Sequence, residues 1–61
     1  MTIEKLERIA NSEPGDHGRG WGLAVRWVAH RRDYEYWQRG AHGQMDRISR
    51  DDAVAILATA A

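Results

Sequence analysis

Hydrophobic residues near the start of the chain recur at three- and four-residue intervals, which is the spacing of one face of an α-helix. The apolar positions of this face are Ile3, Leu6, Ile9 and Ala10. Charged residues fill the opposite side, and Thr2 stands where an N-cap would accept a hydrogen bond from the first turn. Pro14 and Gly15 then interrupt the pattern. The sequence therefore predicts a helix over residues 3–12.

The same spacing returns at the end of the chain. The repeated apolar positions are Ala53, Ile56, Leu57 and Ala60. Ser49 and Asp52 are placed as a variant of the capping box, in which a hydroxyl caps the helix and an acidic residue stands three positions later. Acidic residues also suit the first turn because of the helix dipole. A second helix is predicted over residues 49–60.

Between these helices, the hydrophobic pattern fits two interpretations. Apolar residues alternate with other residues from 21 to 30, which is the period of a strand, and the segment 34–37 continues in the same way after a break. Gly40 and Gly43 bracket a turn before a third short segment. On this interpretation, strands span residues 22–30, 33–39 and 44–48.

The other interpretation is a third helix. Over residues 21–39, a helix would have no proline inside and would bring onto one face Leu23, Trp27, Tyr34 and Trp37. Periodicity alone does not decide between the two, but the β-branched and aromatic residues and the glycine-bracketed turn favour strands. We therefore expect one small α+β domain over residues 1–61, with an N-terminal helix, a three-stranded antiparallel meander and a C-terminal helix. The alternative is an all-α three-helix bundle.

Glycines are concentrated in residues 13–22, between the first helix and the first strand. Together with Pro14, they predict a flexible connection. The segment does not match a phosphate-binding loop, because no Gly-Lys-Ser/Thr follows and the Gly-x-Gly-x-x-Gly spacing is missing.

The small size of the chain limits its core. A domain of 61 residues buries only about 60% of its unfolded surface, and with no cysteine it has no disulfide to stabilise it. A binding partner, or a second copy of the chain in a homodimer, is the stabilising element that remains. The N-terminus lacks the basic and apolar segments of a signal peptide, and no apolar run is long enough to span a membrane. A cytoplasmic location without membrane contact is expected.

Little in the chain points to catalysis. Thr2 and Ser49 have helix-capping roles, and there is no cysteine nucleophile. Asp33 and Glu35 would share one face of a strand, but paired carboxylates need a cleft that shifts their pKa, which a domain of this size rarely builds alone. The histidines are His17, His30 and His42, without the i, i+4 spacing of a metal-binding helix. We expect no enzyme, no metal site and no cofactor.

Arginine and aromatic residues in the middle of the chain are the main functional signal. Nine basic and nine acidic residues cancel, yet seven arginines and only three acids lie between His17 and Arg50. Five aromatic residues fall in the same stretch, namely Trp21, Trp27, Tyr34, Tyr36 and Trp37. A core this small cannot bury all of them, and tryptophan, tyrosine and arginine are enriched at binding hot spots.

The length of the turn between the first two expected strands decides which of these side chains stay outside the core. A turn of two or four residues places Trp27, Tyr34 and Tyr36 under the helices and Trp37 on the opposite face, whereas a three-residue turn moves Trp37 into the core. On the first alternative, we predict a partner-binding surface of Arg26, His30, Arg31, Arg32, Trp37, Arg39 and Arg47. Arginines that only solvate this face and shield Trp37 with their aliphatic stems are the simpler explanation.

Two functions fit these residues. The first is a small non-catalytic protein-binding module, for example a regulator or inhibitor of a larger complex that is encoded by a phage or other mobile element. The second is a nucleic-acid-binding domain, since arginines between stacking aromatics suit single strands and RNA.

The order of the expected elements bears on this choice. It is similar to that of double-stranded RNA-binding domains, but the likeness stops at topology. Those domains place lysines at the start of the last helix, where this chain has Arg50 followed by Asp51 and Asp52. Two carboxylates there would repel a phosphate, so a protein or a second copy of the chain is the preferred partner.

Overall fold

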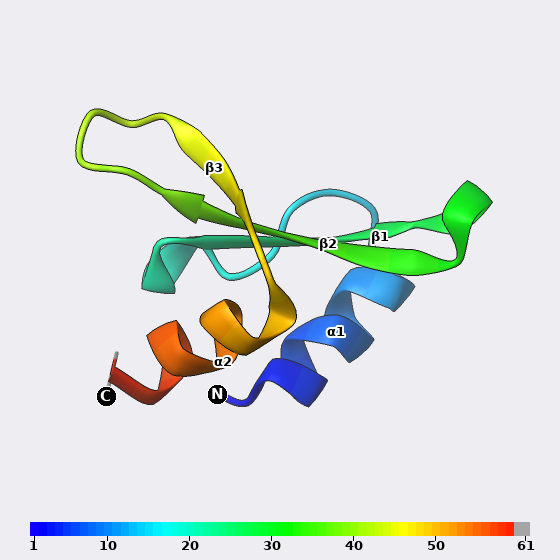
Figure 1. Ribbon diagram of the computed structural model, residues 1–61. Coiled ribbons are helices and arrows are strands. Elements are labelled where there is room, and N and C mark those ends of the chain that lie inside the picture. Colours follow the sequence, from blue (N-terminus) through cyan, green and yellow to red (C-terminus); the bar gives the residue numbers. More distant parts are fainter. Residues whose placement is uncertain (60–61) are drawn as a thin grey trace.

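The computed structural model describes residues 1–59 and confirms the α+β interpretation (Figure 1). The elements are α1 (Ile3–Ser12), β1 (Leu23–Val28), β2 (Asp33–Arg39), β3 (Met45–Ile48) and α2 (Arg50–Thr59). The strands form one antiparallel sheet in the order β1-β2-β3. Residues 21–39 form no long helix, so the three-helix bundle is wrong. The predicted end of the second helix, Ala60, lies outside the described residues.

Element boundaries differ from the predicted ones mainly at the first strand. This strand was expected over 22–30, but β1 ends at Val28 and a short 3-10 turn follows at Ala29–Arg31. Ala29 and His30 are therefore exposed in a turn and do not lie on a strand face. The turn closes at Arg32, whose φ of 51° is unusual for a residue with a side chain.

Both helices begin at the capping residues that the sequence indicates. The Thr2 side chain accepts a hydrogen bond from the Lys5 backbone N–H at 3.3 Å. The Ser49 hydroxyl accepts one from the Asp52 backbone N–H at 3.1 Å. In each case, the hydroxyl satisfies a backbone donor that has no partner within the helix.

The glycine-rich segment 13–22 is bound to the sheet and is not a plain linker. His17 and Val25 form an antiparallel bridge, with backbone N···O distances of 3.0 and 2.7 Å. The Leu23 N–H donates to the Gly18 carbonyl at 3.1 Å, and Gly18 has a φ of 101° that suits glycine. The segment was predicted as a flexible connection, and these bonds attach part of it to the edge of β1 that does not pair with β2.

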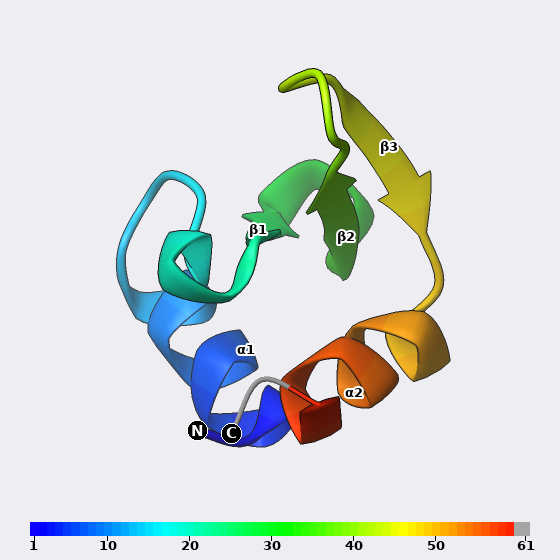
Figure 2. The ribbon, with the colours of Figure 1, turned by 90° about the vertical axis from the view of Figure 1, so that its left-hand side faces the viewer.

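Both helices lie on the same side of the sheet, as Figures 1 and 2 show. We call the side that faces them the inner face and the opposite side the outer face. α1 contacts β1, α2 contacts β2, and the two helices contact each other. The core therefore fills the space between the inner face and the helix pair.

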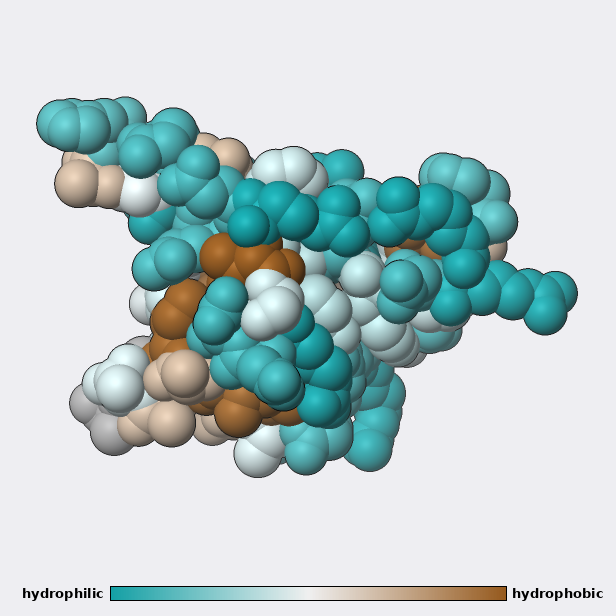
Figure 3. Space-filling view, viewed as in Figure 1, coloured by the Kyte–Doolittle hydropathy of each residue, from teal (hydrophilic) through white to brown (hydrophobic). Residues whose placement is uncertain are grey.

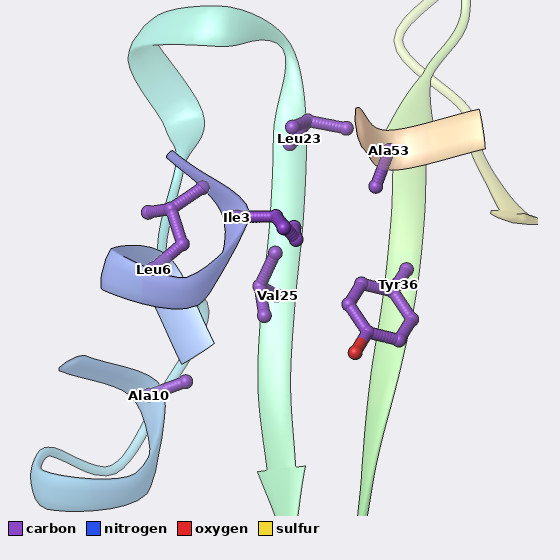
Figure 4. Packing of buried hydrophobic residues seen from close by; sticks show 7 residues of the cluster. All are labelled: Ile3, Leu6, Ala10, Leu23, Val25, Tyr36 and Ala53. Atoms are coloured by element: carbon purple, nitrogen blue, oxygen red, sulfur yellow. The ribbon is translucent and has the colours of Figure 1, made fainter. Parts of the chain in front are cut away.

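Pairing of β1 with β2 decides which residues enter this core. Val25 lies opposite Tyr36 and Trp27 opposite Tyr34, so four residues, 29–32, connect the strands. This even number places all four side chains on the inner face, as the even-turn alternative predicts. Figure 4 shows the buried cluster, which consists of Ile3, Leu6, Ala10, Leu23, Val25, Tyr36 and Ala53. Trp27 and Tyr34 pack at its margin with their ring centroids 4.8 Å apart.

A polar contact next to the core ties three elements together. The Glu7 carboxylate on α1 accepts a hydrogen bond from the Tyr36 hydroxyl on β2. It also pairs with Arg50 at the start of α2, with N···O distances of 2.8 and 3.2 Å. The hydrogen bond from Arg50 is the main reason that the pKa of Glu7 lies below its usual value. Burial, together with the bond to Glu7, raises the pKa of the Tyr36 hydroxyl.

Replacement of a core residue is expected to unfold much of the protein. Leu6 is 2% exposed, and Leu6→Ala should cost about 2–5 kcal/mol through lost burial and the cavity left behind. A domain with so small a core has only about 3–5 kcal/mol of stability in total. Urea denaturation followed by far-ultraviolet circular dichroism measures the change. Full retention of the folded signal and midpoint would contradict this packing.

Removal of the Glu7 charge is expected to change the response to acid. Because the pKa of Glu7 is lowered in the folded state from 4.5, its contribution to stability is present above about pH 4.5 and is lost as the pH falls through the folded value. Glu7→Gln should cost about 2 kcal/mol at pH 7 and should flatten the loss of stability in acid. Denaturation midpoints between pH 7 and pH 3 test this. Parallel curves for the two proteins would show that Glu7 is not the group responsible.

Candidate functional site

The outer face of the sheet is covered by neither helix and carries most of the residues predicted for binding. Its composition follows from the register, which pairs Arg26 with Glu35 and Trp37 with Arg47. On the neighbouring strand β1, Ala24 lies opposite Trp37 and is almost fully buried at 4% exposure. In Figure 3, hydrophilic colours cover the upper side of the molecule, above the sheet, while hydrophobic colours gather at lower left over α2.

The Glu35 carboxylate organises the centre of this face. Three arginine side chains approach it, Arg26 at 4.0 Å, Arg31 at 3.4 Å and Arg47 at 3.6 Å. The Glu35 side chain is only 13% exposed, whereas those of its arginine partners are nearly half exposed. The partners come from three different places in the chain, namely β1, the turn after β1 and β3. We call these four residues the Glu35 cluster.

The Trp37 ring is held within reach of the Glu35 cluster. Its indole N–H donates to the Glu35 carboxylate at 3.4 Å. The Arg47 guanidinium lies 5.7 Å from the centre of the ring, which is within cation–π range. Glu35 thus orients the edge of the Trp37 ring, and Arg47 covers part of its face.

Arg26 links the sheet to the glycine-rich segment. Its guanidinium donates two hydrogen bonds to the Asp16 carboxylate, at 2.8 and 3.4 Å. The hydrogen bonding from Arg26 is the main reason that the pKa of Asp16 lies below its usual value, and the charge of Arg19 contributes further. Arg26 is therefore occupied by Asp16 and Glu35 together.

The other predicted residues lie apart from the Glu35 cluster. His30 and Arg32 are exposed at the tip of the β1–β2 hairpin, because the strand ends before them. Arg39 lies at the opposite end of β2, across from Met45 of β3. The predicted surface is thus divided between the cluster, the hairpin tip and the Arg39 end of the sheet.

Two adjoining pockets open at the Arg39 end of the outer face. The first has a volume of about 230 Å³ and is lined by Asp16, Arg19, Gly22, Leu23, Ala24, Arg39, Gly43 and Met45. The second has a volume of about 290 Å³ and is lined by Asp16, Ala24, Arg26, Trp37 and Met45. Because Asp16, Ala24 and Met45 line both, the two pockets lie side by side, and we call them together the double pocket.

Most residues that line the double pocket were not predicted as binding residues, among them Asp16, Arg19 and Met45. Asp16 and Arg19 belong to the glycine-rich segment, and only the long-range pairing of His17 with Val25 brings them beside the sheet. Met45, which is 42% exposed, reaches the pocket because it lies opposite Arg39. The turn at Gly40 and Gly43 was the one sequence signal from which the pairing of Met45 with Arg39 could have been predicted.

Residues 1–59 contain neither a cluster of metal ligands nor a helix that could cross a membrane. Within this range, no group of three or more histidine, cysteine, aspartate or glutamate residues is arranged to hold a metal ion. None of the helices in the same range has the length and apolar character needed to cross a membrane.

Comparison with known proteins adds no family assignment. No protein-family model matches the chain, and neither the curated proteins nor the solved structures include a significant match.

Loss of the Glu35 charge is expected to release Arg47 from the Trp37 ring. Glu35→Gln removes the ion pair and retains a side chain of similar size, so Arg47 should sample more rotamers. Because the arginine partners are about half exposed, the loss of stability should not exceed about 1 kcal/mol. Proton NMR of the Arg47 side chain, which the Trp37 ring current shifts, measures the effect. Unchanged Arg47 shifts in the variant would rule out Glu35 as the residue that positions this arginine.

Proposed function

We propose that the chain is a small non-catalytic protein-binding module that docks through the outer face of its sheet. Its role would be that of a regulator or inhibitor that occupies a surface of a larger complex. The observation that carries this proposal is the placement of Trp37 beside Met45 on a face that neither helix covers, next to a double pocket. An apolar anchor with a charged surround is typical of protein-binding surfaces.

The order of the Trp37 side chain supports a binding role. Its contacts with Glu35 and Arg47 restrict the ring before any partner arrives. A side chain that is already held in place loses less conformational entropy on binding. Most of the candidate face also lies on strands, which hold such a surface more rigidly than loops do.

Charge pairing favours a protein over a nucleic acid as the partner. Arg26, Arg31 and Arg47 are already paired with Glu35 or Asp16, which together cancel two of their three charges and lower their capacity to replace the counterions of a phosphate backbone. Arg47 also covers part of the Trp37 ring on which a base would stack. At the start of α2, Arg50 is paired with Glu7, and the neighbouring Asp51 and Asp52 are exposed.

The state of the carboxylates supports a role without catalysis. A general base needs a carboxylate that is free to take a proton from a substrate. Glu35 is surrounded by guanidinium groups, and Asp33 accepts a hydrogen bond from the Tyr34 backbone N–H at 2.8 Å. Both carboxylates have structural partners that account for their presence.

Self-association would use a different part of the molecule. Exposed apolar side chains on the helix side include Met1 at 51% and Val54 at 39%, and they line a pocket of about 260 Å³ between α1 and α2. A homodimer formed there would leave the outer face open to another protein. Sedimentation equilibrium separates the two kinds of binding, because only self-association depends on the concentration of this chain alone.

The Trp37→Ala variant tests the proposed surface. Tagged protein should retain a defined partner from nuclease-treated lysate of its source cells, and the variant should lose at least about 10-fold in affinity for that partner. Met45→Asp, which places a charge at an exposed position of the same face, should have a similar effect.

The matched control is Arg8→Ala, at an exposed arginine of α1 on the helix side. It should bind as the unaltered protein does, and circular dichroism should show all variants folded. Equal binding by Trp37→Ala would exclude the outer face. Partners that disappear on nuclease treatment would favour a nucleic-acid-binding domain instead.

A further inference from the structure

The double pocket places two different chemistries side by side. Its first compartment is bordered by the guanidinium-bearing residues Arg19 and Arg39, and its second by Trp37. Ala24 and Met45 line both compartments. Because the alanine at position 24 is small and lies opposite the large Trp37 ring, the surface is hollowed between the ring and the glycine-rich segment.

Positive charge in the first compartment is not balanced within the described chain. Neither Arg19 nor Arg39 forms an ion pair with any residue from 1 to 59. Asp16 is the only carboxylate in the lining, and Arg26 already binds both of its oxygens. The recess therefore holds two arginine charges against one carboxylate that Arg26 already shares, although the net charge of the whole chain is zero.

We propose that the double pocket binds an extended acidic segment of the partner protein. One aspartate or glutamate side chain of that segment enters the first compartment and pairs with Arg19 and Arg39. A neighbouring aliphatic or aromatic side chain enters the second compartment against Trp37 and Met45. This inference rests on the proposed function, since it names the chemistry of the partner that docks on the same face.

The size of the compartments favours single side chains. Taken separately, the compartments have volumes of about 230 and 290 Å³, at or below the lower limit of roughly 300 Å³ for pockets that enclose a whole small-molecule ligand. Arginine suits a carboxylate in such a recess because its planar guanidinium can donate two parallel hydrogen bonds. In the second compartment, Asp16 and Arg26 are paired with each other. The rest of its lining is Ala24, Trp37 and Met45, which suits a leucine or phenylalanine side chain.

Selection of peptides by the full chain tests this proposal. The probe is a phage-displayed library of short random peptides, panned against the immobilised protein. The enriched peptides should share one acidic residue and one large apolar residue at a constant spacing. A synthetic peptide of that kind should bind Arg39→Glu or Arg19→Glu at least about 10-fold more weakly than the unaltered protein. Exchange of its acidic residue for lysine should restore binding to Arg39→Glu.

The control is Arg8→Glu, which places the same charge change at an exposed arginine of α1, outside both compartments. It should not weaken binding of the peptide by more than about 2-fold, the scale of an exposed charge interaction. Since the side chains of Arg19 and Arg39 form no ion pair in the described chain, the three variants should give the same circular dichroism spectrum.

Four results would overturn the proposal. These are the absence of any enriched peptide, enrichment without acidic residues, an equal loss in Arg8→Glu and Arg39→Glu, and oligonucleotide binding that Arg39→Glu abolishes. A protein partner that Trp37→Ala loses and both pocket variants retain would leave the proposed function in place and reject only the acidic segment.

Discussion

The placement of both helices on one face depends on the Glu7 carboxylate. It receives the Tyr36 hydroxyl from β2 and the Arg50 guanidinium from α2, while its own backbone belongs to α1. One side chain thus joins the two helices to the middle strand beside the core. The apolar residues of both helices are buried against the inner face, so no helix remains to cover the outer face. The openness of the candidate site is therefore a consequence of packing on the opposite side of the sheet.

A second carboxylate, Glu35, links side chains from several elements on the outer face, as Glu7 does on the inner face. Glu7 binds one arginine closely, and Glu35 lies among three. Most arginines of the sheet are therefore paired with nearby carboxylates and do not act as a general basic surface. The balance of nine basic and nine acidic residues conceals this arrangement, because it averages the paired arginines with those that form no ion pair in residues 1–59, Arg19 and Arg39 among them. The character of the surface depends on which arginines lack a partner.

Much of the fold could be predicted from the sequence because periodicity and caps are local signals. α1 and β2 have their expected bounds, and the even-turn alternative places Trp37 outside the core. The end of β1 could not be predicted, since alternation continues through Ala29 and an arginine at position 32 does not indicate a positive φ. The double pocket could not be predicted either. It requires the pairing of His17 with Val25, and nothing in the glycine-rich segment indicates that contact.

The four-residue turn between β1 and β2 restricts how the chain can vary in evolution. Insertion or deletion of one residue among 29–32 would exchange the two faces of β2. Tyr36 would then point to solvent, and Trp37 would enter a core shaped for another side chain. A change of two residues would preserve both faces and alter only the reach of the tip. Natural length variants of this hairpin should therefore differ by even numbers of residues, so that the tip can diversify while the binding face keeps its identity.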